Sequence, residues 1–355
     1  MTRVARFEIH YTQFLDHHAN VVQELPVSFR GPTALIPLYR AMVLTRTFDK
    51  KAIALQRTGQ LGTFASCLGQ EAIGVAIGSA MRADDVLLPF YRDYAAQFLR
   101  GVRMTDIFLY WGGDERGMNY AIPRRDFPIC VPVASHACHA AGVAAAIKYR
   151  HEARVAVCIL GDGATSKGDF YESINIAGVW QLPAVFVINN NQWAISVPRS
   201  AQSAAETLAQ KAIAAGIQGE QVDGNDVIAV SHAVITALDK ARSGGGASLI
   251  EALSYRLGDH TTADDARRYR PLEEVERHWQ YDPIARLRTY LVRLGYWSEQ
   301  DETALQSECG RQVEEAVNHY LKTPPQPLST LFDYLYASLP AALESQYRHA
   351  CETGE

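Results

Sequence analysis

The sequence has no excess of basic residues and no long apolar run, and each absence excludes a class of partner. Its 355 residues contain 34 Lys and Arg against 39 Asp and Glu, a formal net charge of −5. Nucleic-acid binding needs clustered positive charge to meet the phosphate backbone. No stretch reaches the roughly 18 apolar residues of a membrane-spanning helix, and residues 1–13 have no signal-peptide core. We therefore expect no nucleic-acid partner, no membrane partner and a cytoplasmic location.

Cysteine is scarce and shows no paired spacing. The chain has six cysteines and no Cys-X-X-Cys pair, and Cys158 lies inside an apolar run. Reduced thiols are the simplest interpretation of this distribution. The segment His136-Ala137-Cys138-His139 resembles half of a zinc site, but no convincing further ligands lie nearby in the sequence. We interpret it as the polar start of a helix.

The remaining composition is typical of a globular α/β protein. The chain is 48% hydrophobic and 21% charged, as is ordinary for folded domains, and its length allows one large domain or two modest ones. We find no linker that would separate two independently folding parts. We predict an N-terminal extended arm at residues 1–30, an α/β domain at 31–270, and a helical C-terminal region at 271–355 packed on the same domain.

Hydrophobic patterning places the elements of this domain. Apolar or small residues recur at helical spacing in five stretches, whereas short apolar and β-branched runs mark four buried strands. The expected helices cover residues 33–57, 69–81, 137–149, 204–216 and 227–242, and the expected strands cover 86–90, 155–160, 184–188 and 248–257. Because strands and helices alternate, we predict a central, mostly parallel sheet flanked by helices.

The chain is organised around residues 155–196. The apolar run 155–160 ends at Gly161-Asp162-Gly163, and the run 184–188 ends at Asn189-Asn190-Asn191. A right-handed crossover brings the carboxyl ends of two parallel strands to the same edge of the sheet. Asp162 and Asn191 would then lie side by side, although they are 191 − 162 = 29 positions apart. A carboxylate and an amide oxygen that converge in this way suit a hard divalent cation carrying a diphosphate.

The segment Gly161-Asp162-Gly163 also fits part of a dinucleotide-binding fingerprint. That fingerprint needs a third glycine at position 166, where this chain has Ser166, and an acidic residue after the second strand, where it has asparagines. Asp162 would also point a negative charge at the pyrophosphate. A nicotinamide oxidoreductase is therefore disfavoured. Two unrelated structural turns explain each half of the motif, but not why both halves follow strands joined by one crossover.

Two further groups follow strands at the same predicted edge. Arg92 comes just after 86–90, where α/β sheets bind ligands, and a guanidinium suits phosphate. A surface ion pair between Arg92 and Asp93 explains the sequence equally well. His260 follows the strand 248–257 in an acidic loop. It is either a solvated loop residue or a group that, titrating near neutrality, could protonate or orient a developing alkoxide.

Taken together, these motifs resemble the alpha subunit of the decarboxylating component of 2-oxo acid dehydrogenase complexes, such as the pyruvate and branched-chain enzymes. The stretch 161–191 matches the thiamine diphosphate motif of that family, and the resemblance runs through nearly the whole chain. It includes Gly69-Gln70-Glu71-Ala72, Tyr91-Arg92-Asp93, Asn190-Asn191-Gln192-Trp193-Ala194-Ile195-Ser196, and Tyr255-Arg256 through Asp265. The resemblance implies an enzyme that binds thiamine diphosphate and Mg²⁺.

The resemblance also assigns roles to individual residues. It implies that Asp162 and Asn191 bind Mg²⁺ through their side chains and that Trp193 adds its main-chain carbonyl. It implies a diphosphate site formed by Tyr91, Arg92, Gly163, Ala164 and Arg256.

For the other end of the cofactor, the resemblance implies that main-chain groups of Val131 and Val133 hold the aminopyrimidine. His260 matches the active-site histidine that lies near the thiazolium carbon and assists acyl transfer to a lipoyl group.

Two positions depart from the family pattern. Some members have an arginine just before the paired asparagines, where this chain has Asn189, so one phosphate contact is missing or is replaced by Arg92 and Arg256. Many members carry a second active-site histidine before the aminopyrimidine strand, but this chain has none between 19 and 135, and its loop 114–125 looks shortened. The second departure bears on recognition of the substrate carboxylate and on lipoyl docking.

The implied activity is that of a pyruvate dehydrogenase alpha subunit, with a branched-chain 2-oxo acid dehydrogenase or an acetoin dehydrogenase alpha subunit as alternatives. Gln60-Leu61-Gly62 and Gly295-Tyr296-Trp297-Ser298 look nearer to the bacterial pyruvate enzymes. The expected partners are a beta subunit in an α2β2 heterotetramer and the lipoyl domain of a dihydrolipoyl acyltransferase. A non-catalytic scaffold with the same fold is disfavoured, because the metal pair, the arginines and His260 are all present.

Overall fold

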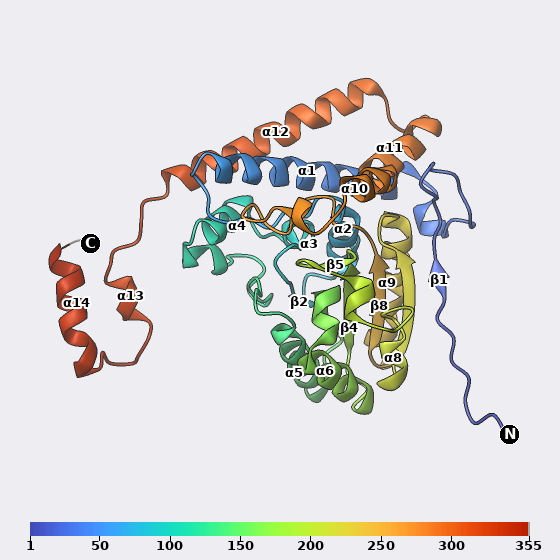
Figure 1. The fold of residues 1–355 in the computed structure, drawn as a ribbon, viewed down its shortest axis with the longest axis horizontal. Coiled ribbons are helices and arrows are strands. Elements are labelled where there is room, and N and C mark those ends of the chain that lie inside the picture. The colour runs from blue at the N-terminus through green and yellow to red at the C-terminus, as the bar shows by residue number, and fades with distance from the viewer. Residues whose placement is uncertain (354–355) are drawn as a thin grey trace.

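The computed structural model describes residues 1–353 and is built on a six-stranded sheet with helices on both faces (Figure 1). The strand order is β1-β7-β8-β4-β3-β2, and every pair of neighbours is parallel. These strands are β1 (Tyr11–Thr12), β2 (Val86–Leu88), β3 (Ala156–Gly161), β4 (Ala184–Asn190), β7 (Gln218–Asp223) and β8 (Ser248–Leu253), while β5 (Trp193–Ala194) and β6 (Val197–Pro198) form a separate antiparallel pair. The predicted α/β fold class is confirmed.

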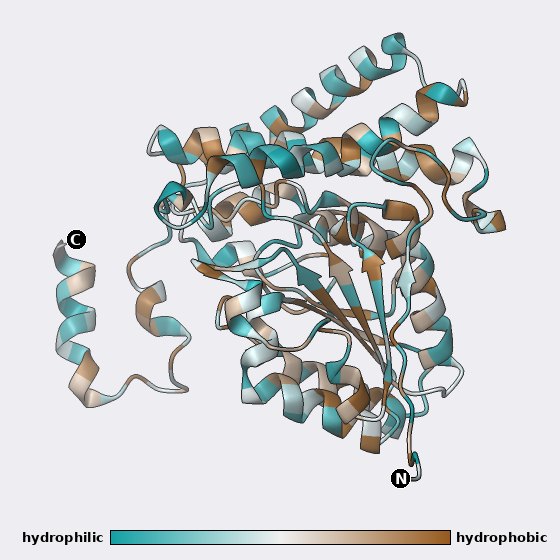
Figure 2. Cartoon of the chain, turned by 45° about the vertical axis from the view of Figure 1, so that its right-hand side comes forward, coloured by the Kyte–Doolittle hydropathy of each residue, from teal (hydrophilic) through white to brown (hydrophobic). Residues whose placement is uncertain are grey.

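Alternate residues of the central strand β3 supply two different hydrophobic cores. Val157 and Ile159 pack in the core on one face of the sheet, whereas Cys158 and Leu160 pack in the core on the other. This two-residue alternation is what a strand buried on both faces produces. Figure 2 shows that the central strands are mainly apolar, whereas the outer helices carry long hydrophilic stretches.

Each face has its own set of helices. The first face is covered by α2 (Glu71–Ala80) and α9 (Val227–Arg242), and the second by α5 (Ser135–Tyr149), α6 (Gly168–Val179) and α8 (Lys211–Ala214). Outside α2 lie α1 (Pro32–Arg57) and α12 (Glu299–Lys322), which pack together with α3 (Tyr94–Leu99), α4 (Met104–Trp111) and α11 (Pro283–Arg293). The short segments are α7 (Arg199–Gln202), α10 (Leu272–His278), α13 (Thr330–Asp333), α14 (Ala341–Thr353), and the 3₁₀ turns η1 (Val27–Phe29), η2 (Glu115–Met118), η3 (Asp162–Ser166), η4 (Ala266–Arg268) and η5 (Trp279–Tyr281). Within residues 1–353, none of the helices combines the length and apolar character that crossing a membrane requires.

The two ends of the chain behave differently. After β1, residues 13–30 are anchored to the body: Phe14 and Leu15 are buried in the first core, and their main-chain N–H groups donate to the carboxylate of Asp226. At the other end, α13 and α14 lie away from the sheet (Figure 1) and contact each other through the rings of Phe332 and Tyr347. The division into an arm, a central domain and a helical region stays a prediction.

One predicted helix is wrong. Residues 204–216 form only the short α8, and an unpredicted strand, β7, follows it. Side-chain contacts take the groups that a helix would use: Arg199 binds the carbonyls of Ser203 and Ala205, and the Ala209 N–H donates to the buried Glu251. These contacts override local helix propensity.

Candidate active site

The carboxyl ends of β3 and β4 meet as predicted. The two strands are parallel neighbours, with Gly161 opposite Asn189. Asp162 opens the η3 turn directly after β3, and Asn191 comes directly after β4. Both side chains line one cavity of about 570 Å³. The juxtaposition expected from a right-handed crossover is therefore present.

This cavity collects nearly all residues singled out in the sequence. Its walls include Tyr91, Arg92, Val131, Val133, Asp162, Gly163, Ala164, Asn191, Trp193 and His260. Arg256 lies just behind the wall, fully buried, with Nη2 donating to the Ile195 carbonyl at 2.9 Å and Nη1 3.4 Å from the Trp193 carbonyl. Residues from four strand ends and two loops thus converge on one space.

The Asp162 carboxylate is only partly satisfied by the protein. The residue is 2% exposed, and its Oδ2 atom is buried without a hydrogen-bond partner. Burial raises the pKa of this carboxyl to about 6, although the positive charge of Arg256 opposes the shift. A buried oxygen without a donor is costly, so the site is suited to a cation.

The chemistry of the donors fits Mg²⁺ held jointly with a phosphate ligand. Across residues 1–353 there is no cluster of three or more His, Cys, Asp or Glu side chains that could enclose a metal. Mg²⁺ is commonly bound by one or two protein oxygens, with phosphate oxygens and water filling the remaining positions. One carboxylate, Asp162, and one amide, Asn191, beside a pocket meet that description. We conclude that the residues present fit a magnesium diphosphate group.

Gly163 is required by a close approach of the chain. A Cβ atom at this position would lie 2.9 Å from Cβ of Ala194, which is closer than carbon atoms pack. The side-chain amide of Gln202 reaches the same turn, where it donates to the Asp162 carbonyl at 3.1 Å and accepts from the Gly163 N–H at 3.2 Å. The sequence did not single out Gln202, because it lies in a stretch without a recognisable pattern.

Two buried guanidinium groups lie next to His260. Arg92 donates from Nη1 to the Ser66 carbonyl and from Nη2 to the His260 carbonyl, the latter at 2.6 Å. Burial, and then the charge of Arg92, lowers the pKa of Arg256 to about 10. Neither guanidinium forms a salt bridge with any described residue, so the predicted alternative of an Arg92–Asp93 ion pair is wrong. Adjacent buried cations that form no direct ion pair favour an anionic ligand.

His260 is held in one orientation. Its Nδ1 atom lies 3.0 Å from Nη2 of Arg92 and 3.4 Å from Nη1 of Arg256, and its main-chain N–H donates to Asp264 at 2.9 Å. Because guanidinium groups can only donate, Nδ1 must accept, and the ring proton must sit on Nε2. His260 is thus a half-buried, oriented donor in the cavity wall rather than a solvated loop residue.

The expectation that His260 titrates near neutrality is wrong for the cofactor-free chain. Burial, followed by the charges of Arg92 and Arg256, lowers its pKa from 6.5 to about 4, while Asp264 acts in the opposite direction. The imidazole is therefore neutral at pH 7. The sequence could not reveal this, because Arg92 lies 168 positions away and no local pattern shows that Arg256, in the loop after β8, faces the ring.

We expect this lowered pKa to appear as a pH-dependent loss of stability. A histidine whose pKa is depressed by folding adds stability above its unfolded value of 6.5, and that stability is lost as the pH falls towards about 4. Urea unfolding at a series of pH values between these limits should show wild type losing stability relative to His260→Asn. The pH-dependent difference in free energy of unfolding between wild type and His260→Asn should be smaller when both proteins also carry Arg92→Met, because one of the charges that lower the pKa of His260 is then absent. Parallel pH profiles for wild type and His260→Asn would contradict the assignment.

The two asparagines of the motif serve different purposes. The Asn190 amide donates to Glu251 on the neighbouring strand β8 at 2.6 Å, and Glu251 also accepts from the Ala209 N–H and from Gln221. Asn190 therefore ties β4 to β8 beneath the site, whereas Asn191 reaches the cavity.

The segment 136–139 is a helix start, as predicted. His136 is buried on the first turn of α5, and its Nε2 lies 2.7 Å from the Ile159 carbonyl. Burial lowers the pKa of His136. Its neighbours form no metal cluster within the described part of the chain.

Comparisons with known proteins match this chain to one family. Residues 39–329 match the family described as the dehydrogenase E1 component. Over 344 residues the chain is 40% identical to the pyruvate dehydrogenase E1 component subunit alpha of Staphylococcus epidermidis. The aligned region covers 97% of this chain and 92% of that protein. The protein of the same description from Staphylococcus aureus shows the same identity and coverage. The matched range contains every residue that the sequence assigns to the cavity.

Proposed function

Because this chain belongs to the dehydrogenase E1 component family, we propose that it is the alpha subunit of a pyruvate dehydrogenase. The observation that carries the proposal is the cavity at the carboxyl edge of the sheet, where Asp162, Asn191, Arg92 and His260 converge. The relatives named above are pyruvate dehydrogenase subunits, and no feature of the cavity favours a branched-chain acid or acetoin over pyruvate.

The cofactors are thiamine diphosphate and Mg²⁺. Asp162, Asn191 and the Trp193 carbonyl would hold the cation. The diphosphate would lie between the glycine turn and the two guanidinium groups, against Tyr91, Arg92, Gly163, Ala164 and Arg256. Val131 and Val133, which also line the cavity, would hold the aminopyrimidine. When bound, thiamine diphosphate supplies the carbon nucleophile and the electron sink for loss of CO₂ from a 2-oxo acid.

The residues of this chain supply position and charge. Arg92 and Arg256 would hold the diphosphate through their positive charge, and because both also contact His260, they would keep the cofactor close to the loop that carries this histidine. His260, neutral and protonated on Nε2, donates a hydrogen bond to a substrate oxygen on which negative charge develops. The half-buried ring keeps that donor in place.

A beta subunit is required to complete the site. Among the residues lining the cavity, Asp162 is the one carboxylate, and it is committed to the cation, so no acid remains to activate the aminopyrimidine. The rim is apolar and exposed: Val131, Val133, Ile195 and Val197 are 43–56% exposed. An apolar rim of this kind favours coverage by another chain. We propose an α2β2 heterotetramer that acts in the cytoplasm and passes its acyl group to the lipoyl domain of an acyltransferase.

The proposal is tested with the chain co-purified with a beta subunit of the same family. With thiamine diphosphate and Mg²⁺, we expect turnover of pyruvate to exceed that of 3-methyl-2-oxobutanoate and acetoin in kcat/KM. One methylene in an apolar pocket discriminates by about 10- to 200-fold, so a clear preference is measurable. A higher kcat/KM for 3-methyl-2-oxobutanoate or acetoin would make that compound the assigned substrate in place of pyruvate. The absence of turnover with all three would reject the proposed activity.

A further inference from the structure

Gln70 lies behind the cation site and contacts it through one hydrogen bond. It belongs to the loop between α1 and α2 and is 3% exposed. Its Oε1 atom accepts from Nδ2 of Asn191 at 2.9 Å, across 121 positions of sequence. No role for this glutamine follows from the motif that contains it. The contact places it one residue away from the site proposed for the cation.

This hydrogen bond selects one end of an asymmetric side chain. The Asn191 amide has an oxygen, which can bind a cation, and an NH₂ group, which cannot. The main chain of Asn191 is already fixed, because its N–H donates to Asn189 and its carbonyl accepts from Arg256. With Gln70 engaging the NH₂ end, Oδ1 is directed to the other side, where it accepts from the Trp193 N–H at 3.2 Å. Rotation of the amide would place two NH₂ hydrogens where the oxygen is needed.

We propose that Gln70 is a positioning residue that keeps Oδ1 of Asn191 directed at Mg²⁺, an inference that rests on the proposed function. Ligand orientation by a neighbouring hydrogen bond is a general requirement of metal sites. Here the required partner is an acceptor, because the group to be held is a donor.

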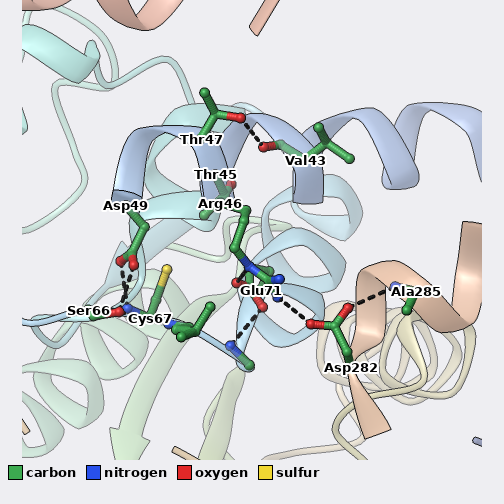
Figure 3. A network of polar contacts seen from close by, with 12 residues as sticks. Val43, Thr45, Arg46, Thr47, Asp49, Ser66, Cys67, Glu71, Asp282 and Ala285 are labelled. Carbon is green, nitrogen blue, oxygen red and sulfur yellow. Dashed lines mark hydrogen bonds and ion pairs between the residues drawn. The ribbon is translucent and has the colours of Figure 1, made fainter. Parts of the chain in front are cut away.

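The loop that carries Gln70 is clamped on both sides. Figure 3 shows Asp49 of α1 bonded to Ser66 and Cys67, the hydroxyl at 2.6 Å and the N–H at 2.8 Å. On the other side, Glu71 accepts from the Gly69 N–H at 3.0 Å and pairs with Arg46. Gln70 therefore stands on a rigid support rather than on a mobile loop.

The same loop supports the diphosphate side of the site. Arg46 also pairs with Asp282 (Figure 3). The Asp282 carboxylate in turn accepts from the Ala285 N–H at 2.8 Å and so caps the start of α11. At the near end, the Ser66 carbonyl accepts from Arg92. One buried loop thus orients a cation ligand through Gln70 and a phosphate-facing guanidinium through Ser66.

A role limited to packing does not explain the choice of glutamine. The Nε2 atom of Gln70 is buried without a partner, which is destabilising. A leucine would fill a similar volume without that cost. The acceptor Oε1 is the part of the side chain that makes a bond, and that bond goes to Asn191.

The test is titration of Mg²⁺ into the α2β2 protein at fixed thiamine diphosphate, followed by calorimetry. Gln70→Leu is expected to weaken Mg²⁺ binding by about 10- to 100-fold, the usual effect of losing a group that orients a ligand. Gln97→Leu is the matched control. Gln97 is an equally buried glutamine with one hydrogen bond, to Tyr120 at 3.0 Å, and its replacement should leave the Mg²⁺ affinity unchanged.

A double-mutant cycle separates orientation from general damage. In Asn191→Asp both ends of the side chain are oxygens, so no end needs to be selected. In that background, Gln70→Leu is expected to weaken Mg²⁺ binding by no more than about threefold, because either oxygen of the aspartate can face the cation without help from Gln70. An equal loss in both backgrounds, or a loss in Gln97→Leu, overturns the proposal.

Gln70→Glu keeps the acceptor and covers the case in which Gln70→Leu does not fold. It should bind Mg²⁺ no more than about threefold more weakly than wild type, and a tenfold loss in a folded variant overturns the proposal. If wild type binds no Mg²⁺ with thiamine diphosphate, the proposed function itself fails. If wild type binds and Gln70→Leu matches it, only the role of Gln70 fails.

Discussion

Replacing Asp162 with alanine should abolish Mg²⁺-dependent binding of thiamine diphosphate. The carboxylate is the one acidic group in the cavity wall, and one of its oxygens has no protein partner. Removing one member of a buried ion pair costs about 3–5 kcal/mol, which corresponds to roughly 100- to 3,000-fold in affinity. Fluorescence or calorimetric titration of the α2β2 protein with the cofactor, at saturating and at zero Mg²⁺, measures this loss.

The same substitution should leave the cofactor-free fold intact. Because the buried Oδ2 atom of Asp162 makes no hydrogen bond, its removal deletes no stabilising contact from that atom, and the midpoint of thermal unfolding should not fall by more than a few degrees. Asp169→Ala is the matched control. Asp169 lies three residues after the end of the η3 turn, and its side chain is 41% exposed and pairs with Lys167 at 3.7 Å. Normal cofactor titration in Asp162→Ala would refute the central assignment.

The sequence was sufficient for those parts of the site that depend on strand topology. Two apolar runs joined by one helix imply parallel strands with a common edge, and this alone predicted that Asp162 and Asn191 share a cavity. Strand β7 was not predicted, because its residues Gln218, Glu220 and Gln221 give no apolar alternation. It pairs on one side with β8 and on the other with the two-residue β1 near the exposed edge of the sheet.

The sequence was insufficient wherever the outcome depends on a long-range polar contact. The Gln70–Asn191 bond joins residues 121 positions apart, and no local pattern encodes such a pairing. His260 shows the same limit for electrostatics. Its neighbours in sequence are acidic, which suggests a raised pKa, but the groups that face its Nδ1 are two guanidinium groups. Burial, together with the charges of these two groups, consequently lowers the pKa of His260.

The paired asparagines illustrate why a sequence motif does not reveal which of its residues has which role. As successive residues at a strand end, Asn190 and Asn191 must point in different directions. Asn190 bonds to Glu251 within the sheet, and Asn191 faces the cavity. Substitution of either would disturb the cofactor, but for different reasons. One anchors the strand, and the other supplies the oxygen.

The chain purified without a beta subunit should not decarboxylate pyruvate at a significant rate, even with saturating thiamine diphosphate and Mg²⁺. General acid–base catalysis contributes about 10²- to 10⁴-fold, and the cavity wall contains no carboxylate other than Asp162 that could provide it. The open, apolar rim at Val131, Val133 and Ile195 also leaves the cofactor accessible to water, which weakens every electrostatic contact that Arg92 and His260 make. We therefore expect the isolated chain to be at least about 10³-fold less active than the α2β2 protein, measured as release of CO₂ from pyruvate. Adding the purified beta subunit should restore turnover, whereas full activity of the isolated chain would mean that the catalytic acid lies within this sequence.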